Sequence, residues 1–321
     1  MPQTIIGCDL ARGWIDTHVL PSGATARIEN TPEGVARWAA SLRDGALVVF
    51  EGEAEDGSVR GTDPPPNGGC DGPLIEALAG RGVRFARVNP RQAREFARAL
   101  GVLAKTDRVD ARILAEMGRM LPLEATAPPD PDRARLADFL RRRKQLVEMR
   151  KAEKVRRHNA GQPAILREIE TMIALLDQRI ANMDREIAAL IAASPALDEQ
   201  AQLLSAVPGI GPTVLATLLG ELPELGALCR RRVASLAGLA PHARESGSWR
   251  GTRRIWGGRR KVREALYIAA LSASRRVPTL IAMRGRMRAA GKAQKTILIA
   301  IARQLLVILN AMIRHREPIR L

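Results

Sequence analysis

Apolar and polar positions change their spacing along the chain, and the first spacing marks an N-terminal domain. Residues 4–11, 14–20 and 24–30 alternate or run apolar between tight turns, which predicts three consecutive strands. The run ALVVFE (46–51) is continuously apolar, as in a strand buried on both faces. We expect the remaining elements to be helices at about 31–45, 72–82, 91–100 and 106–120 and a strand at about 83–90. This order predicts an α/β domain with a mixed sheet over residues 1–128.

A second spacing, by three and four, begins after residue 129. Residues 133–192 are almost free of glycine, and the apolar residues of the second half form a heptad seam. We therefore assign 129–195 as a helical linker, either a coiled coil or a long helical hairpin, and expect it to self-associate. The first half is strongly basic, so its charged face either contacts phosphate or is simply solvated. The seam residues are Ile165, Ile169, Met172, Leu176, Ile180, Met183, Ile187 and Leu190.

The last part of the chain, 196–321, is predicted to be mainly α-helical. Its stretch LLSAVPGIGPTVLATLLGEL (203–222) has the pattern of a helix-hairpin-helix motif. In that motif Gly209 and Gly211 would let backbone amides and a helix N-terminus approach a DNA phosphate. The same PGIG sequence also fits docking within the molecule, or an ordinary tight turn between core helices.

One segment, TILIAIARQLLVILNAMI (296–313), is apolar enough to require a test for a membrane span. Arg303, Gln304 and Asn310 interrupt it near its middle, where charged and polar groups are costly in lipid. We therefore predict a buried helix packed against its neighbours and no membrane partner.

Composition narrows the class of partner. The 321 residues include 51 Lys and Arg against 34 Asp and Glu, a net charge of +17. Such a balance favours a polyanion, because each neutralised phosphate releases counterions. The three cysteines and four histidines form no metal-binding spacing or disulfide framework, which suits a reducing compartment. No charged-then-apolar leader is visible at the start, so we expect a cytoplasmic protein associated with the nucleoid.

Four acids stand out against this basic background. Asp9 ends the first strand and Glu51 ends the buried one, and such strand ends converge at one edge of a sheet. Asp107 and Asp110 lie one helical turn apart and share a face, with Lys105 beside them. Oxygen ligands without histidine or cysteine suit Mg²⁺ or Mn²⁺, and paired ions promote phosphodiester cleavage. The alternative is that Asp107 and Asp110 complement the helix dipole and pair with neighbouring cations.

A second set of candidate residues lies in GLAPHARESGSWRGTRRIWGGRRKVREALYIAAL (238–271). Small residues and arginines in a loop before a helix suit the close approach of a phosphate backbone to a hydroxyl. Ser246 or Ser248 could attack a phosphodiester if a base or metal activated it, although SGS in a basic loop is also compatible with a plain loop. The candidate phosphate contacts are Arg250, Arg253, Arg254, Arg259 and Arg260.

Taken together, these stretches resemble one protein family. GCDLA, the strand-terminal Glu51, NPRQAREFARALGVLAKTDRVDARILA, the PGIG stretch and the 238–271 stretch occur in order over nearly the whole chain. They resemble the DEDD transposases of the IS110 insertion-sequence family, in particular its IS1111 subgroup. The KTDxxDA and SGxxRGxRxIxGGRxxVRxAL patterns are highly specific when they occur together.

The resemblance implies a RuvC-like, RNase H-like N-terminal domain, a coiled-coil linker and a C-terminal domain carrying a serine nucleophile. It implies that Asp9, Glu51, Asp107 and Asp110 bind Mg²⁺ or Mn²⁺, and that Ser246 links covalently to DNA during strand cleavage and exchange. It further implies a structured guide RNA made by the element, pairing with target and donor DNA, and a homo-oligomer, dimer or tetramer, with a composite active site.

The chain departs from the family pattern after Glu51. An insertion at about 52–71 separates Glu51 from the GGCDGPLIEAL stretch, where Cys70 replaces the usual tyrosine. The insertion supplies two further acids, Glu53 and Glu55, but Glu51 alone ends the apolar strand. Two alternatives to an active transposase therefore stay open. One is an inactive nucleic-acid-binding relic, and the other is a Holliday-junction-type nuclease that uses the four acids and water.

Overall fold

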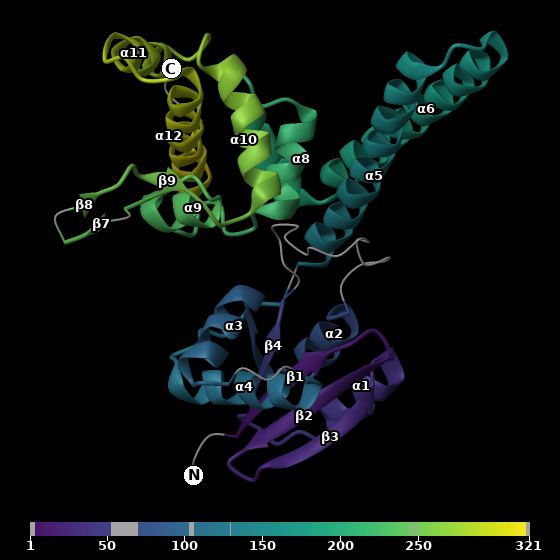
Figure 1. The fold of residues 1–321 in the computed structure, drawn as a ribbon, viewed down its shortest axis with the longest axis vertical. Coiled ribbons are helices and arrows are strands. Elements are labelled where there is room, and N and C mark those ends of the chain that lie inside the picture. The colour runs from purple at the N-terminus through teal and green to yellow at the C-terminus, as the bar shows by residue number, and fades with distance from the viewer. Residues whose placement is uncertain are drawn as a thin grey trace. The chain divides into compact units, whose positions relative to one another are not determined.

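The computed structural model describes residues 4–52, 70–102, 106–128, 130–243, 245–247 and 249–318. The chain divides into two compact units, Met1–Pro129 and Asp130–Leu321. Figure 1 shows a sheet with helices in the first unit and a helical assembly in the second.

The first unit contains a five-stranded mixed sheet in the order β3-β2-β1-β4-β5. β1, β2 and β3 are antiparallel neighbours, whereas β1, β4 and β5 run parallel. The predicted mixed sheet is therefore confirmed. The strands are β1 (Ile5–Leu10), β2 (Trp14–Leu20), β3 (Ala24–Glu29), β4 (Leu47–Glu51) and β5 (Arg84–Val88).

Helices cover both faces of this sheet (Figure 1). α1 (Pro32–Ala40) and α2 (Gly72–Gly80) cover one face, where Cys8 and Phe50 are fully buried. α3 (Pro90–Ala99) and α4 (Asp107–Met120) cover the other, where Val49 is fully buried. Successive residues of a strand point to opposite faces, so the continuous apolar run of β4 supplies both cores.

The second unit begins with two long helices, α5 (Pro131–Asn159) and α6 (Pro163–Ala193), that pack against each other as a hairpin. Ile169, Leu176, Ile180 and Ile187 of the predicted seam are buried, whereas Ile165 and Met172 are exposed and Ile173 is buried as well. Arg143 and Arg150 of α5 form ion pairs with Asp184 and Asp177 of α6. Two of the basic residues on α5 therefore hold the hairpin together.

The remaining helices pack around α12 (Gln294–His315). They are α7 (Pro195–Ser205), α8 (Pro212–Glu221), α9 (Arg230–Leu236), α10 (Arg260–Ala273) and α11 (Pro278–Ala289). Four short strands, β6 (Pro241–His242), β7 (Glu245–Ser246), β8 (Trp249–Arg250) and β9 (Arg254–Ile255), lie between α9 and α10 in sequence. The hairpin shares this core: Leu136 of α5 is fully buried in it. The contacts thus group 130–321 as one unit, where the sequence division separated 129–195 from 196–321.

α12 corresponds to the segment that required the membrane test. By length and hydropathy alone it could cross a bilayer, but half of its most apolar window is buried within the protein. Ile301, Leu305 and Leu309 are fully buried among the other helices. The polar Asn310 is also satisfied, because its Oδ1 accepts from the Gly226 N–H at 2.9 Å and its Nδ2 donates to the Leu228 carbonyl at 2.9 Å. The predicted buried helix is confirmed.

Candidate functional site

The carboxyl ends of β1 and β4 bring Asp9 and Glu51 side by side. The two strands are parallel neighbours, with Cys8 opposite Phe50, so Asp9 and Glu51 occupy the next position along each strand. Cys8 and Phe50 are buried on the face covered by α1 and α2. Because side chains alternate along a strand, Asp9 and Glu51 face the opposite side, which α3 and α4 cover.

α4 crosses that face with its N-terminus at the same edge. A Cβ on Gly7 would lie 2.0 Å from the Ala111 carbonyl oxygen and 2.4 Å from the Ala115 nitrogen, so only glycine permits this close approach. At the other end of α4, a Cβ on Gly118 would lie 2.8 Å from the Ile5 and Val49 side chains. α4 therefore runs back along β1 from its carboxyl end to its start.

The first turn of α4 carries the second pair of acids. Thr106 caps the helix by accepting from the Val109 N–H at 3.4 Å, and its carbonyl accepts from the Asp110 N–H at 2.9 Å. Asp107 and Asp110 both lie in this turn, Asp107 exposed and Asp110 half-buried. The four predicted acids thus lie at one edge and on one face of the sheet. Lys105 lies outside the described residues.

A fifth acid, Asp16, belongs to the same neighbourhood and was not found from the sequence. It lies on β2 directly opposite Asp9 and is buried. Arg27 of β3 holds it through two hydrogen bonds, from Nε to Oδ1 at 3.0 Å and from Nη2 to Oδ2 at 2.6 Å. The same Nη2 lies 3.6 Å from Asp107 Oδ2. The hydrogen bonds that Arg27 donates to Asp16, together with the negative charges of Asp16 and Asp107, raise the pKa of Arg27.

The donor chemistry of this edge fits a hard divalent cation, because every candidate ligand is a carboxylate. Within the described part of the chain, however, no three His, Cys, Asp or Glu side chains lie close enough together to hold a metal ion. The four acids lie at the same edge of the sheet but do not form a complete metal-binding cluster. Asp107 lies close to Arg27. Metal ligation by Asp9, Glu51, Asp107 and Asp110 stays a prediction.

The described residues on both sides of the insertion are held by hydrogen bonds or an ion pair, with Glu51 and Gly52 at the end of β4 and Cys70 and Asp71 just before α2. Its residues 53–69, including Glu53 and Glu55, lie outside the described residues. Glu51 stays in register with Val88, and the Gly52 N–H donates to the Val88 carbonyl at 2.9 Å. On the far side, Asn30 Nδ2 donates to the Cys70 carbonyl at 2.9 Å, and Arg87 pairs with Asp71 at 2.8 Å.

Ser246 lies in the second unit, on a short hairpin. β7 pairs with β8 so that Ser246 lies opposite Trp249, across a turn in which Gly247 has a φ of +56°. That positive φ favours glycine and lets the turn close tightly. Ser246 is exposed, and Ser248 lies outside the described residues. An exposed hydroxyl at the end of a hairpin is accessible to a large substrate such as a DNA strand.

The predicted phosphate contacts around this hairpin separate into different environments. Arg253 is 65% exposed and lies 3.7 Å from Glu245, and Arg254 lies on β9. Arg259 is largely enclosed: its Nη2 donates to Glu224 Oε1 at 2.7 Å and its Nη1 to the Glu221 carbonyl at 3.1 Å. These contacts favour a structural role for Arg259. Arg260 is exposed and pairs along its helix with Glu264, while Arg250 lies on β8.

The PGIG turn connects α7 to α8, and its two glycines differ. Gly209 has a φ of +104°, and a Cβ there would lie 2.8 Å from the Ala269 carbonyl oxygen of α10, so this glycine docks within the molecule. Gly211 precedes α8, is exposed, and has open space around it. Only the Gly211 end of the turn is therefore available for a phosphate contact.

Comparison with known proteins identifies the family. Residues 23–160 match the transposase family of DEDD type, and residues 201–284 match the family described as "Transposase IS116/IS110/IS902 family". The chain is also 32% identical over 239 residues to the "Pilin gene-inverting protein" of Moraxella bovis, covering 72% of this chain and 73% of the relative. The chain belongs to the IS116/IS110/IS902 family of transposases.

Other relatives agree with this assignment. The "Pilin gene-inverting protein" of Moraxella lacunata is 32% identical with the same coverage of both chains. The "Insertion element IS110 uncharacterized 43.6 kDa protein" of Streptomyces coelicolor is 32% identical over 45% of this chain and 35% of its own. The transposase is thus a DNA recombinase by family, and DEDD transposases typically use a divalent metal. Its mixed five-stranded sheet is consistent with a RuvC-like fold.

Proposed function

We propose that this transposase cuts and rejoins DNA strands with Ser246 as nucleophile and with Mg²⁺ or Mn²⁺ held by Asp9, Glu51, Asp107 and Asp110. The observation that carries the proposal is the seating of α4 on Gly7, which brings the first turn of α4 to the strand edge bearing Asp9 and Glu51. The oxygen-only ligand set and the family support the metal.

The chemistry at Ser246 follows from an exposed hydroxyl. Its Oγ would attack a phosphorus of the DNA backbone, forming a phosphoserine ester while the bond from phosphorus to the sugar oxygen breaks. The serine proton passes to the departing oxygen, which becomes a free strand end. The hydroxyl of another strand then attacks the ester, joins to phosphorus and restores the serine. A bound divalent cation would stabilise charge on the oxygens at the phosphorus.

We infer that the protein acts as a homo-oligomer, a dimer or tetramer, with a composite active site shared between subunits. The support for self-association is that the long α5–α6 hairpin exposes several large apolar side chains. They are Met149 at 50% exposure, Val155 at 57%, Ile165 at 53% and Leu175 at 45%. We also propose that the protein binds a structured guide RNA, on the basis of its net charge of +17 and of the family resemblance. We propose that it acts in the cytoplasm, at the nucleoid.

A second outcome of the same chemistry is DNA inversion. The first relatives are named as pilin gene-inverting proteins. Strand exchange between two sites on one DNA molecule, when the sites lie in opposite orientation, inverts the segment between them. A plasmid carrying two element ends in opposite orientation would separate the two outcomes, because inversion keeps the plasmid length and changes its restriction map.

The proposal is tested first by strand cleavage. End-labelled DNA containing the element's end is incubated with the protein, the RNA transcribed from the element's flank and Mg²⁺. We expect cleavage that chelation abolishes and that Asp107→Asn with Asp110→Asn lowers at least a hundredfold. Glu116→Gln, on the same helix, is the matched control and keeps cleavage within about threefold. Binding without cleavage at any Mg²⁺ or Mn²⁺ concentration would instead support the inactive relic, and cleavage that survives Ser246→Ala would support the water-using nuclease.

A further inference from the structure

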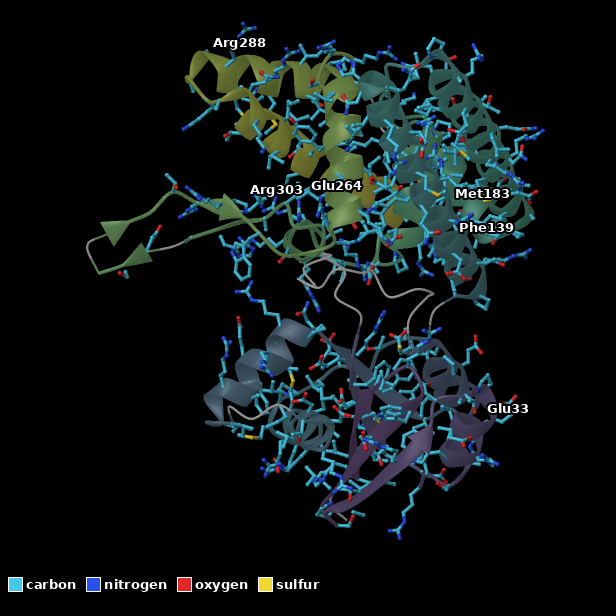
Figure 2. All side chains as sticks on the ribbon, turned by 45° about the vertical axis from the view of Figure 1, so that its right-hand side comes forward. Glu33, Phe139, Met183, Glu264, Arg288 and Arg303 are labelled. Atoms are coloured by element: carbon cyan, nitrogen blue, oxygen red, sulfur yellow. The ribbon has the colours of Figure 1, made fainter. Side chains whose placement is uncertain are left out.

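A pocket of about 980 Å³ lies in the second unit, lined by residues of α9, α11, α12 and the ribbon formed by the paired strands β6 and β9, here called the β6–β9 ribbon. Its volume is at the upper end of the usual range for ligand pockets, ~300–1,000 Å³. Figure 2 labels one of its lining residues, Arg303 on α12.

α12 carries apolar residues on the face that lines the pocket as well as on the face that packs into the core. Thr296, Ile299, Ala300, Arg303 and Val307 line the pocket and recur by three and four, so they share one face of the helix. The buried residues of the core lie on the other face. Ile299, Ala300 and Val307 are only partly covered by the protein itself. The floor of the pocket is therefore an apolar surface that suits a partly apolar ligand.

The rim of the pocket is cationic. Among the described residues that line it, none is acidic. Of the ion pairs between described residues, only the one from Arg253 to Glu245 involves a cation of the rim, and its atoms are 3.7 Å apart. An anionic ligand is favoured, because positive charge collected in a concave site raises the local concentration of anions. The rim cations are Arg230, Arg231, Arg253, Arg254, Lys295 and Arg303.

An apolar floor with cations at the rim matches an unstacked nucleotide. A base inserted into the pocket would contact Ile299 and Val307, while its flanking phosphates reach the arginines. The exposed Gln304, which also lines the pocket, offers an amide that can hydrogen-bond a base edge. An intact duplex exposes phosphates but no base face, so it would leave the floor uncovered.

The pocket also lies close in the chain to the proposed nucleophile. The pocket is lined by Pro241 of β6 and by Ile255 of β9, which pair with each other. The β7–β8 hairpin that carries Ser246 connects these two strands in the sequence. Ser246 follows Pro241 by five residues, so their Cα atoms are at most about 18 Å apart. A strand anchored in the pocket would pass within a few nucleotides of Ser246.

We propose that this pocket binds an unstacked nucleotide of the DNA strand undergoing exchange, holding the neighbouring phosphate near Ser246. The inference rests on the proposed function, since it takes DNA as the substrate and Ser246 as the group to be served. The residues that would hold the base are Ile299, Ala300, Gln304 and Val307, and those that would hold its phosphates are Lys295 and Arg303.

Fluorescence anisotropy with the full chain tests the proposal. The probe is a labelled single-stranded DNA of twelve nucleotides, compared with a strand of the same length in which every base is removed. We expect the wild type to bind the base-bearing strand at least tenfold more tightly. Ala300→Trp, which fills the pocket, should abolish this preference and leave binding of the abasic strand within twofold. Ala311→Trp, at an exposed position of the same helix, is the matched control and should keep the preference.

Two further variants guard against a folding defect. Gln304→Ala, at an exposed position, should weaken only the base-bearing strand, by about threefold to tenfold. Lys295→Ala with Arg303→Ala should weaken both strands and flatten the dependence of affinity on salt, because fewer counterions are released.

The outcomes distinguish this inference from the proposed function. Equal binding of the two strands by the wild type, or equal effects of Ala300→Trp and Ala311→Trp, would refute nucleotide binding in the pocket. Neither result would contradict DNA binding and cleavage by the protein. An effect confined to an RNA strand of the same sequence would overturn the assignment to DNA. If Ala300→Trp loses only its ability to form oligomers, the pocket binds a second copy of the chain. If it loses only binding to phosphatidylserine vesicles, the pocket binds lipid. Failure of the wild type to bind either single strand would likewise refute nucleotide binding in the pocket, whereas failure to bind DNA containing the element's end would contradict the proposed function itself.

Discussion

Replacing Gly7 by alanine should displace the helix that carries Asp107 and Asp110. The added Cβ would lie 2.0 Å from the Ala111 carbonyl oxygen, whereas ordinary contact begins at 3.4 Å. α4 would therefore have to retreat by about 1.4 Å, and because both contacted atoms belong to the backbone, no side-chain rotation can relieve the clash. Overpacking of this kind costs about 1–3 kcal/mol.

The consequence for function should exceed the consequence for stability. A displacement of about 1 Å in a catalytic group can cost roughly a hundredfold in rate. We expect Gly7→Ala to lower the unfolding free energy of the first unit by about 1–3 kcal/mol in a urea titration. We also expect it to weaken Mn²⁺ binding measured by calorimetry at least tenfold and DNA cleavage about a hundredfold.

Gly13→Ala is the matched control for this substitution. Gly13 lies in the same unit, where an added Cβ would meet no atom within 4 Å, and it has no positive φ, so alanine should change stability by less than about 0.5 kcal/mol. If Gly7→Ala unfolds like Gly13→Ala and binds Mn²⁺ like the wild type, α4 does not lie on β1 as described, and the argument for a shared acidic edge fails.

Three further predictions test other contacts. Asp16→Asn removes the charge from the buried partner of Arg27 and should lower the unfolding free energy, measured by urea titration, by about 1–3 kcal/mol. Asp44→Asn, at an exposed position, should leave it unchanged, and equal unfolding free energies for the two variants would mean that the Asp16–Arg27 pair is not held as described. Arg259→Ala should lower the unfolding free energy of the second unit by about 1.5–3 kcal/mol, because Glu224 and the Glu221 carbonyl enclose its guanidinium. Arg260→Ala should leave the unfolding free energy nearly unchanged, because Arg260 pairs at the surface, and the reverse order would refute the structural role of Arg259. Iodoacetamide at pH 7.5 should modify Cys229 well before Cys8 in a mass-spectrometric time course. The backbone N–H groups of Arg232 and Arg231 lower the pKa of Cys229 and increase its thiolate fraction, whereas burial and the charge of Asp9 raise the pKa of Cys8 and keep it protonated. Early labelling of Cys8 would contradict its burial.

The sequence was sufficient where a local pattern determines the outcome. The short apolar run ending at Asp9 and the apolar run ending at Glu51 predicted strands whose ends meet, and the structure has these strands as parallel neighbours. The helix predicted at about 106–120 likewise matches α4, which Thr106 caps. Each of these features depends on residues that are adjacent in the chain, so periodicity and capping rules apply directly.

Features that depend on pairing between distant residues were missed. The Asp16–Arg27 bond needs the register of β2 on β3, which the tight turn between them could have supplied. The heptad rule misplaced Met172, because burial in this hairpin is set by the facing helix, which covers Ile173. The short strands around Ser246 are too brief to show an alternating pattern, and the basic pocket draws on α9, the β6–β9 ribbon, α11 and α12. No window of sequence contains such a site.

A covalent link between Ser246 and DNA would distinguish the serine nucleophile from attack by water, and it can be detected directly. The protein is incubated with DNA containing the element's end, the RNA from the element's flank and Mg²⁺, and the products are separated on a denaturing gel. Ser246→Ala and Ser248→Ala are run beside the wild type. We expect a protein–DNA band in the wild type and in Ser248→Ala that is lost in Ser246→Ala and in Asp107→Asn. Strand cleavage without such a band, or a band that persists in Ser246→Ala, would contradict a nucleophilic role for Ser246.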